Sequence, residues 1–172
     1  MEKSLIAVTF ASLLMAGAAQ ATDHSASIDI SGTAIGSPSE CSVYATPSIT
    51  LTGAISKMPT QGDDSTDPTV INYSIGSNSD PSCLDNIAII VTGTADDADQ
   101  TTIANTDKGA NAAKGVGIGL YDSALKPLKI NESTLSSATN MGQINLQLVK
   151  LKGQTQVEGT VHGSLTLEIT HI

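Results

Sequence analysis

The feature that most constrains this sequence is the alternation of apolar and polar residues at its C-terminal end. The even positions between 162 and 170 are all polar, and the odd positions are Val161, Gly163, Leu165, Leu167, Ile169 and His171. Side chains alternate between the two faces of a β-strand, so the pattern predicts a strand with one buried face. Because the pattern runs to the last residues, it leaves open what covers the edge of this strand.

The first 21 residues have the composition of a secretory signal peptide. Lys3 precedes an apolar run over residues 5–14, and Ala19-Gln20-Ala21 supplies the small-x-small cleavage site. The run is too short for a transmembrane helix. We therefore predict export, cleavage after Ala21, and a single mature domain.

The composition of the rest of the chain limits which residue types can form the core and which classes of partner the protein can bind. The only Phe is Phe10, in the predicted signal peptide, and the chain has no Trp and no Arg. A core must therefore be built from Ile, Leu, Val and Ala. The formal net charge of −9 argues against binding nucleic acid, because phosphate neutralisation by basic residues supplies most of that affinity.

Short strand-like stretches follow one another after residue 21 and are separated by Gly, Asp, Asn and Pro. We count about eight of them and no convincing helix, which predicts an all-β sandwich. Residues 58–68 and 96–114 are polar and read as long exposed loops. Between Leu148 and Val149 the apolar phase slips by one residue, which predicts a β-bulge near Leu148.

Three groups of residues have a functional interpretation that is weaker than the structural one. The glycines of GVGIGLYD (115–122) lack the third Gly and the following helix of a dinucleotide fingerprint, and favour a strand against which another segment packs closely. ADDAD (95–99) lacks the features of a calcium loop. The three histidines have no metal-ligand spacing, and no nucleophile–base pair is visible. We predict no catalytic, cofactor or metal site.

Cys41 and Cys83 are the only cysteines of the chain. In an exported protein an even number of cysteines most simply forms a disulfide, whereas two cysteines alone make a poor metal site.

Together these features resemble the type 1 fimbrial pilins of the chaperone–usher pathway. The resemblance rests on the signal peptide, on ISGTA (30–34) before a Cys, on a second Cys about forty residues later near NIAIIVTGTA (86–95), on GVGIGLYD, and on the alternating final strand. It covers essentially the whole chain after residue 21.

The resemblance implies an incomplete immunoglobulin-like β-sandwich that lacks its last strand and is completed by a donor strand from another subunit. A periplasmic chaperone would fill the groove first, and an outer-membrane usher would then assemble neighbouring subunits into an extracellular fimbrium on the bacterial surface that supports adhesion. It also implies the domain limits: residues 1–21 as signal peptide, 22–31 as donor extension and 32–172 as pilin domain.

Carried over position by position, the resemblance assigns roles to individual residues. Cys41 and Cys83 match the disulfide of the family. The buried donor positions are Ala26, Ile28 and Ile30. The chaperone and donor groove is lined by Val161, Leu165, Leu167, Ile169, His171 and Ile172.

Two positions depart from the family pattern. His171 stands where the family usually has Tyr, and Ala26 stands where the donor usually has a Gly that lets successive strands cross. Both departures point to a minor or divergent subunit. A fibre-terminating subunit stays an alternative, because the extension before Ile28 is short and polar.

Two other functions compete with a structural subunit. One is a minor or tip subunit that itself binds a host receptor, through the loops at 58–68 or 95–114. The other is a secreted β-sandwich enzyme, against which the lack of a catalytic constellation argues.

Overall fold

The structure, a computed structural model, describes residues 25–32, 41–77, 87–96, 99–136 and 140–171. It is built of strands with one short 3₁₀ helix, η1 (Ile55–Lys57), and confirms the all-β sandwich. The described strands are β1 (Ser25–Gly32), β2 (Cys41–Ala45), β3 (Ser48–Thr52), β4 (Thr69–Ser77), β5 (Ile87–Gly93), β6 (Thr102–Ile103), β7 (Val116–Tyr121), β8 (Thr134–Ser136), β9 (Met141–Lys150) and β10 (Val161–His171).

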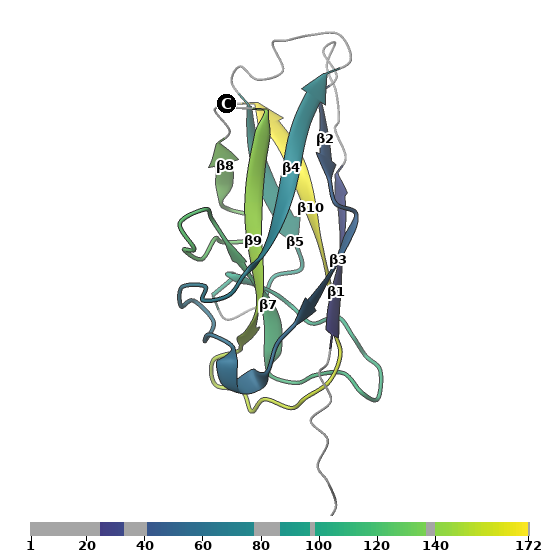
Figure 1. Ribbon diagram of the computed structural model, residues 1–172, viewed down its shortest axis with the longest axis vertical. Helices are drawn as coiled ribbons and strands as arrows, with labels where there is room; N and C mark the ends of the chain where they lie inside the picture. Colours follow the sequence, from purple (N-terminus) through teal and green to yellow (C-terminus); the bar gives the residue numbers. More distant parts are fainter. Residues whose placement is uncertain (1–24, 33–40, 78–86, 97–98, 137–139, 172) are drawn as a thin grey trace, which may run out of the picture.

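The strands form two five-stranded sheets that face one another (Figure 1). The first sheet has the order β3-β1-β10-β5-β8, and the second has the order β2-β4-β9-β7-β6. In Figure 1 the long strands β4 and β9 of the second sheet lie in front of β10 and β5 of the first. The core lies between these two layers.

The core is built from the alternating aliphatic residues of both sheets, as the composition requires. Leu165 and Leu167 of β10 face a second layer that includes Ile118 of β7 and Leu146 of β9, and all four are at most 1 % exposed. Tyr73 of β4 adds an aromatic ring to this core, which has no Phe or Trp. The period-two pattern of the final strand is confirmed, since His162, Ser164 and Glu168 are exposed.

The glycines of β7 allow close packing, as the sequence predicts. All six residues of β7 are buried. A Cβ on Gly117 would collide with the Thr102 side chain, and one on Gly119 would lie 2.6 Å from the hydroxyl oxygen of Tyr121. Any side chain at these two positions would therefore force β6 or Tyr121 away from the sheet.

The prediction of a β-bulge near Leu148 is wrong. β9 pairs with β7 without interruption from Asn145 to Lys150, and with β4 from Met141 to Leu146. The apolar phase changes because residues on both faces of β9 are buried there: Leu148 faces the core, and Val149, on the opposite face, is also fully buried. A strand buried on both faces does not need to alternate.

The segment 58–68 is exposed only in part, whereas its polar composition predicted an exposed loop. Met58, Gln61 and Ser65 are buried. The Ser65 hydroxyl donates to Gln147 Oε1 at 2.6 Å, and the backbone N–H of Thr66 donates to the same oxygen at 2.9 Å. The segment thus lies on β9, and its polar residues form hydrogen bonds with the strand.

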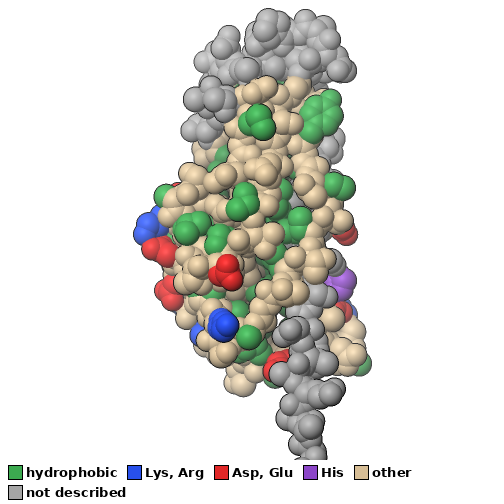
Figure 2. Space-filling model, viewed as in Figure 1, with side chains coloured by type: hydrophobic (Ala, Val, Ile, Leu, Met, Phe, Trp, Pro, Cys, Tyr) green, Lys and Arg blue, Asp and Glu red, His purple; other side chains and the backbone are tan. Residues whose placement is uncertain are grey.

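The outer face of the second sheet carries several exposed hydrophobic side chains. Figure 2 shows them over β2, β4 and β9, among polar side chains. Tyr44, Val70 and Met141 are between 49 and 64 % exposed. No helix among the described residues has the length and apolarity needed to cross a membrane.

Candidate strand-acceptor groove

β10 presents the predicted inward row of side chains to the core. Val161, Leu165 and Leu167 are at most 2 % exposed, and Ile169 is partly buried against the core. Full burial of each such side chain contributes about 1.5–3 kcal/mol. The backbone of His171 pairs with Ile87, whereas its side chain and residue 172 lie outside the described part of the molecule.

The groove is the space between β3 and β10, and β1 lies in it. β1 pairs with β10 in parallel, with Ala26 opposite Val161 and Gly32 opposite Leu167. On its other edge β1 pairs with β3 in the antiparallel sense, from Ser25 opposite Thr52 to Asp29 opposite Ser48. β3 joins this sheet through β1 alone. Without β1, the facing edges of β3 and β10 would both lack a partner strand.

The predicted donor positions all fall on β1. Ile28 stands opposite Gly163 of β10 and Ile49 of β3, and Ile30 stands opposite Leu165. The side chains of Ala26, Ile28 and Ile30 lie outside what the structure describes, so their burial stays a prediction. The sequence assigned these positions to a neighbour's groove, and the structure places their backbone in the groove of the same chain.

Two further residues contribute to the groove: Leu51, which the sequence analysis missed, and Gly163, which the alternation placed on the inward face but which was not assigned to the groove. Leu51 of β3 is 2 % exposed and forms the wall opposite β10. Gly163 lines the bottom of the groove, where core side chains pack directly against its backbone. A Cβ at this position would lie 2.8 Å from Ile118 Cδ1 and 2.9 Å from Ile103 Cγ2. The alternation in SITLT (48–52) could have indicated Leu51, since its neighbours at positions 50 and 52 are polar.

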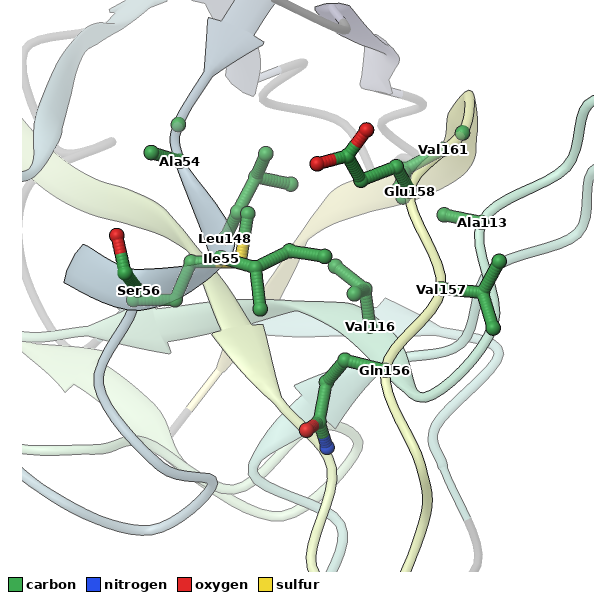
Figure 3. A pocket seen from close by; sticks show the side chains of 13 residues that line it. Ala54, Ile55, Ser56, Ala113, Val116, Leu148, Gln156, Val157, Glu158 and Val161 are labelled. Atoms are coloured by element: carbon green, nitrogen blue, oxygen red, sulfur yellow. The ribbon is translucent and has the colours of Figure 1, made fainter. Parts of the chain in front are cut away.

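A cavity of about 570 Å³ opens where β1 and β10 begin. Val161, which stands opposite Ala26, lines it together with Met58, Val116 and Leu148. Figure 3 shows Ile55 and Ser56 on one side and Gln156, Val157 and Glu158 on the other. The groove therefore continues beyond the first residue of β1 into an open apolar space.

Asn105 fixes the start of β10 to the segment before β7. Its Nδ2 donates to the carbonyl oxygens of Ala113 at 3.0 Å and of Thr160 at 3.2 Å. Its Oδ1 accepts the backbone N–H of His162 and that of Asp107, both at 3.0 Å. One side chain thus satisfies four backbone groups beside the first residues of the groove strand.

Asp107 strengthens the same junction. Its carboxylate accepts hydrogen bonds from the Thr160 hydroxyl and from the backbone N–H of Gly109, and it lies 3.9 Å from His162 Nε2. The bond from Thr160, followed by that from Gly109, lowers the pKa of Asp107 below its usual value. The ionised carboxylate that makes these contacts is therefore present at neutral pH and is lost only as the pH falls through the lowered pKa.

The predicted disulfide is only partly visible in the structure. Cys41 begins β2, is 5 % exposed and is disulfide-bonded. Cys83 lies outside the described residues, so its role as the partner stays a prediction.

The described residues contain no group of three or more His, Cys, Asp or Glu side chains placed to hold a metal ion. The segments predicted for receptor binding are held against the sheets. Gln147 holds 58–68, and the start of β10 holds the part of 95–114 that follows residue 104. Receptor binding through these segments stays a prediction.

The fold defines a β-sandwich in which one sheet is completed by a strand from the N-terminal end. The family model described as fimbrial protein matches residues 28–171, from within β1 to the end of β10. The chain belongs to the fimbrial protein family. It is accordingly a subunit of a surface appendage that assembles with other pilin subunits, and the family is structural and generally non-enzymatic. No curated protein matches the sequence.

Proposed function

We propose that this chain is a structural subunit of a chaperone–usher fimbria and polymerises by donor-strand exchange. The N-terminal strand of one copy, with Ala26, Ile28 and Ile30 as buried positions, fills the groove of the next copy. A periplasmic chaperone fills the groove before assembly, an outer-membrane usher assembles the fibre, and the fibre supports cell adhesion.

The observation that carries the proposal is the position of β1 between β3 and β10. Without β1 the facing edges of these two strands would be open, and the chain itself carries a segment whose backbone register fits both. Strand addition to an open sheet edge gives affinity through backbone hydrogen bonds and specificity through alternate side chains. The same complementarity is available between two copies.

The test compares donor-impaired and matched chains that begin at Thr22 and are co-expressed with a periplasmic fimbrial chaperone. I28N/I30N places polar side chains at two proposed buried donor positions, and D29N changes the exposed residue between them. We expect the unchanged chain and D29N to form SDS-resistant multimers that dissociate on boiling, and I28N/I30N to form at least tenfold fewer.

A labelled peptide of residues 22–32 separates a donor defect from a failure to fold. I28N/I30N retains an unchanged groove, so it should bind this peptide and become SDS-resistant with it. Multimers of I28N/I30N at the level of the unchanged chain would refute the donor assignment. Absence of multimers from the unchanged chain and D29N alike would refute polymerisation itself.

A further inference from the structure

The donor strand and the acceptor groove of this chain occupy one another. The residues that we propose as donor, 25–32, are paired along both of their edges within the same molecule. A chain in this state offers no free donor strand to a neighbour. It also offers no free groove, because β1 covers the edge of β10 from Val161 to Leu167.

We propose that β1 is an autoinhibitory plug that keeps the free subunit closed until another strand displaces it. This inference rests on the proposed function, since a plug inhibits only if the same strand and groove serve assembly. The competing ligand is the N-terminal strand of a second copy of this chain. Assembly then requires either that the groove be occupied before the plug enters or that the plug be exchanged.

The short connection to β2 makes the plug a strong competitor. Only residues 33–40 separate the end of β1 from the start of β2. A short tether of this kind gives β1 an effective concentration at its own groove in the millimolar range. When the subunit concentration is micromolar, an equally well-fitting strand from another copy is therefore disfavoured by about a thousandfold. The plug therefore slows assembly even when the intermolecular pairing is as good as the internal one.

The parallel register provides a way to trap the plug. Asp29 stands opposite Ser164 of β10, and both residues are exposed. Paired residues on neighbouring strands lie within the Cα–Cα range of about 4.4–6.8 Å that a disulfide requires. The exposed residue Glu168 lies four positions further along β10, roughly 13 Å away, which is too far for a bond to residue 29.

The experiment uses the full chain from Thr22 with D29C/S164C as the trap and D29C/E168C as the matched control. Both variants are oxidised at several dilutions, and the disulfides are assigned by peptide mass mapping against the native Cys41 bond. Each protein is then tested for multimers and for uptake of a labelled peptide of residues 22–32. We expect the 29–164 bond to form within monomers, independently of dilution. The trapped protein should then form at least tenfold fewer multimers and take up at least tenfold less peptide than the control.

Three outcomes distinguish the inference from the proposed function. A 29–164 bond that forms only between molecules, or not at all, while the chain multimerises, overturns the plug and leaves donor-strand exchange standing. A bond within monomers together with full multimerisation of the trapped chain overturns autoinhibition. A bond within monomers of the trap, with a control that neither multimerises nor takes up peptide, makes β1 a permanent strand and overturns the proposed function as well.

Discussion

At the scale of single residues, Gly163 shows how an unremarkable position determines the shape of a groove. It is the one glycine in the inward row of β10, and the side chains of Ile118 and Ile103 pack directly onto its backbone. The alternation of the strand placed Gly163 on the inward face. Sequence alone did not say which core side chains would lie above it, because these come from the opposite sheet.

Gly163→Ala is expected to destabilise the protein by about 1–3 kcal/mol, the usual cost of overpacking a core. The added Cβ would lie 2.8 Å from Ile118 Cδ1. Ile118→Val removes that terminal methyl, so G163A/I118V should lose less stability than the sum of the two single changes. Urea unfolding of the four proteins measures this coupling, and strictly additive losses would show that the two residues do not meet.

Tyr121 predicts an alkaline limit to stability. Burial, followed by the nearby charges of Asp63 and Asp64, raises its pKa to about 12. Because the folded state disfavours the ionised phenol, the contribution of Tyr121 is complete below its unfolded pKa of about 10 and is lost as the pH rises toward 12.

Unfolding by urea at pH values from 8 to 12 tests this effect. Tyr121→Phe should decline less steeply above pH 10 than the unchanged protein. Some decline should remain, since burial also raises the pKa of Tyr73. Tyr44→Phe is the matched control, because Tyr44 is 57 % exposed. Identical profiles for Y121F and the unchanged chain would contradict the assignment.

At the scale of elements, the alternation of apolar and polar residues predicted the strands and their buried faces correctly in most places. It predicted the buried row of β10 and the strand character of β7. It failed where a second layer covers the sheet, as at Val149, because a pattern within one strand does not reveal what lies on its outer face. For the same reason the polar composition of 58–68 predicted exposure, although Gln61 and Ser65 are buried with hydrogen-bond partners.

Asn105 should hold the start of β10 in place. Asn105→Ala removes one hydrogen bond from each of four backbone groups, including the N–H of His162. The carbonyl of Thr160 keeps the N–H of Ala113 as a donor. Each intramolecular hydrogen bond contributes about 0.5–1.5 kcal/mol, so the N-terminal end of β10 should open more readily without them.

Hydrogen exchange of the His162 amide measures this opening. We expect exchange at least tenfold faster in N105A, with little change in the middle of β10. Asn111→Ala is the matched control, because Asn111 lies in the same segment and is exposed. Equal protection of His162 in N105A and the unchanged chain would show that the junction does not depend on this side chain.

At the scale of the whole molecule, the fold class and the family were predictable, but the position of β1 was not. Strand periodicity, the cysteine spacing and the glycines of β7 were enough to indicate the family that the match over residues 28–171 shows. The alternating segment SIDIS indicates a strand that needs a sheet edge. Such a segment fits an edge of its own chain and of a second copy alike, so its local pattern cannot distinguish the two.

The disulfide at Cys41 should tie the two sheets together. Cys41 opens β2, an edge strand of the second sheet, and its predicted partner Cys83 precedes β5, an inner strand of the first. A bond between them would close a loop of roughly 40 residues, and chain entropy assigns such a loop about 3–4 kcal/mol. C41S/C83S should therefore unfold at a lower urea concentration, with a loss of unfolding free energy of about that size, because its unfolded chain is no longer cross-linked.

Thiol titration of denatured protein tests the pairing directly. The unchanged chain should show no reactive thiol, and C41S should show one. Two thiols in the unchanged chain, or none in C41S, would mean that Cys83 is not the partner.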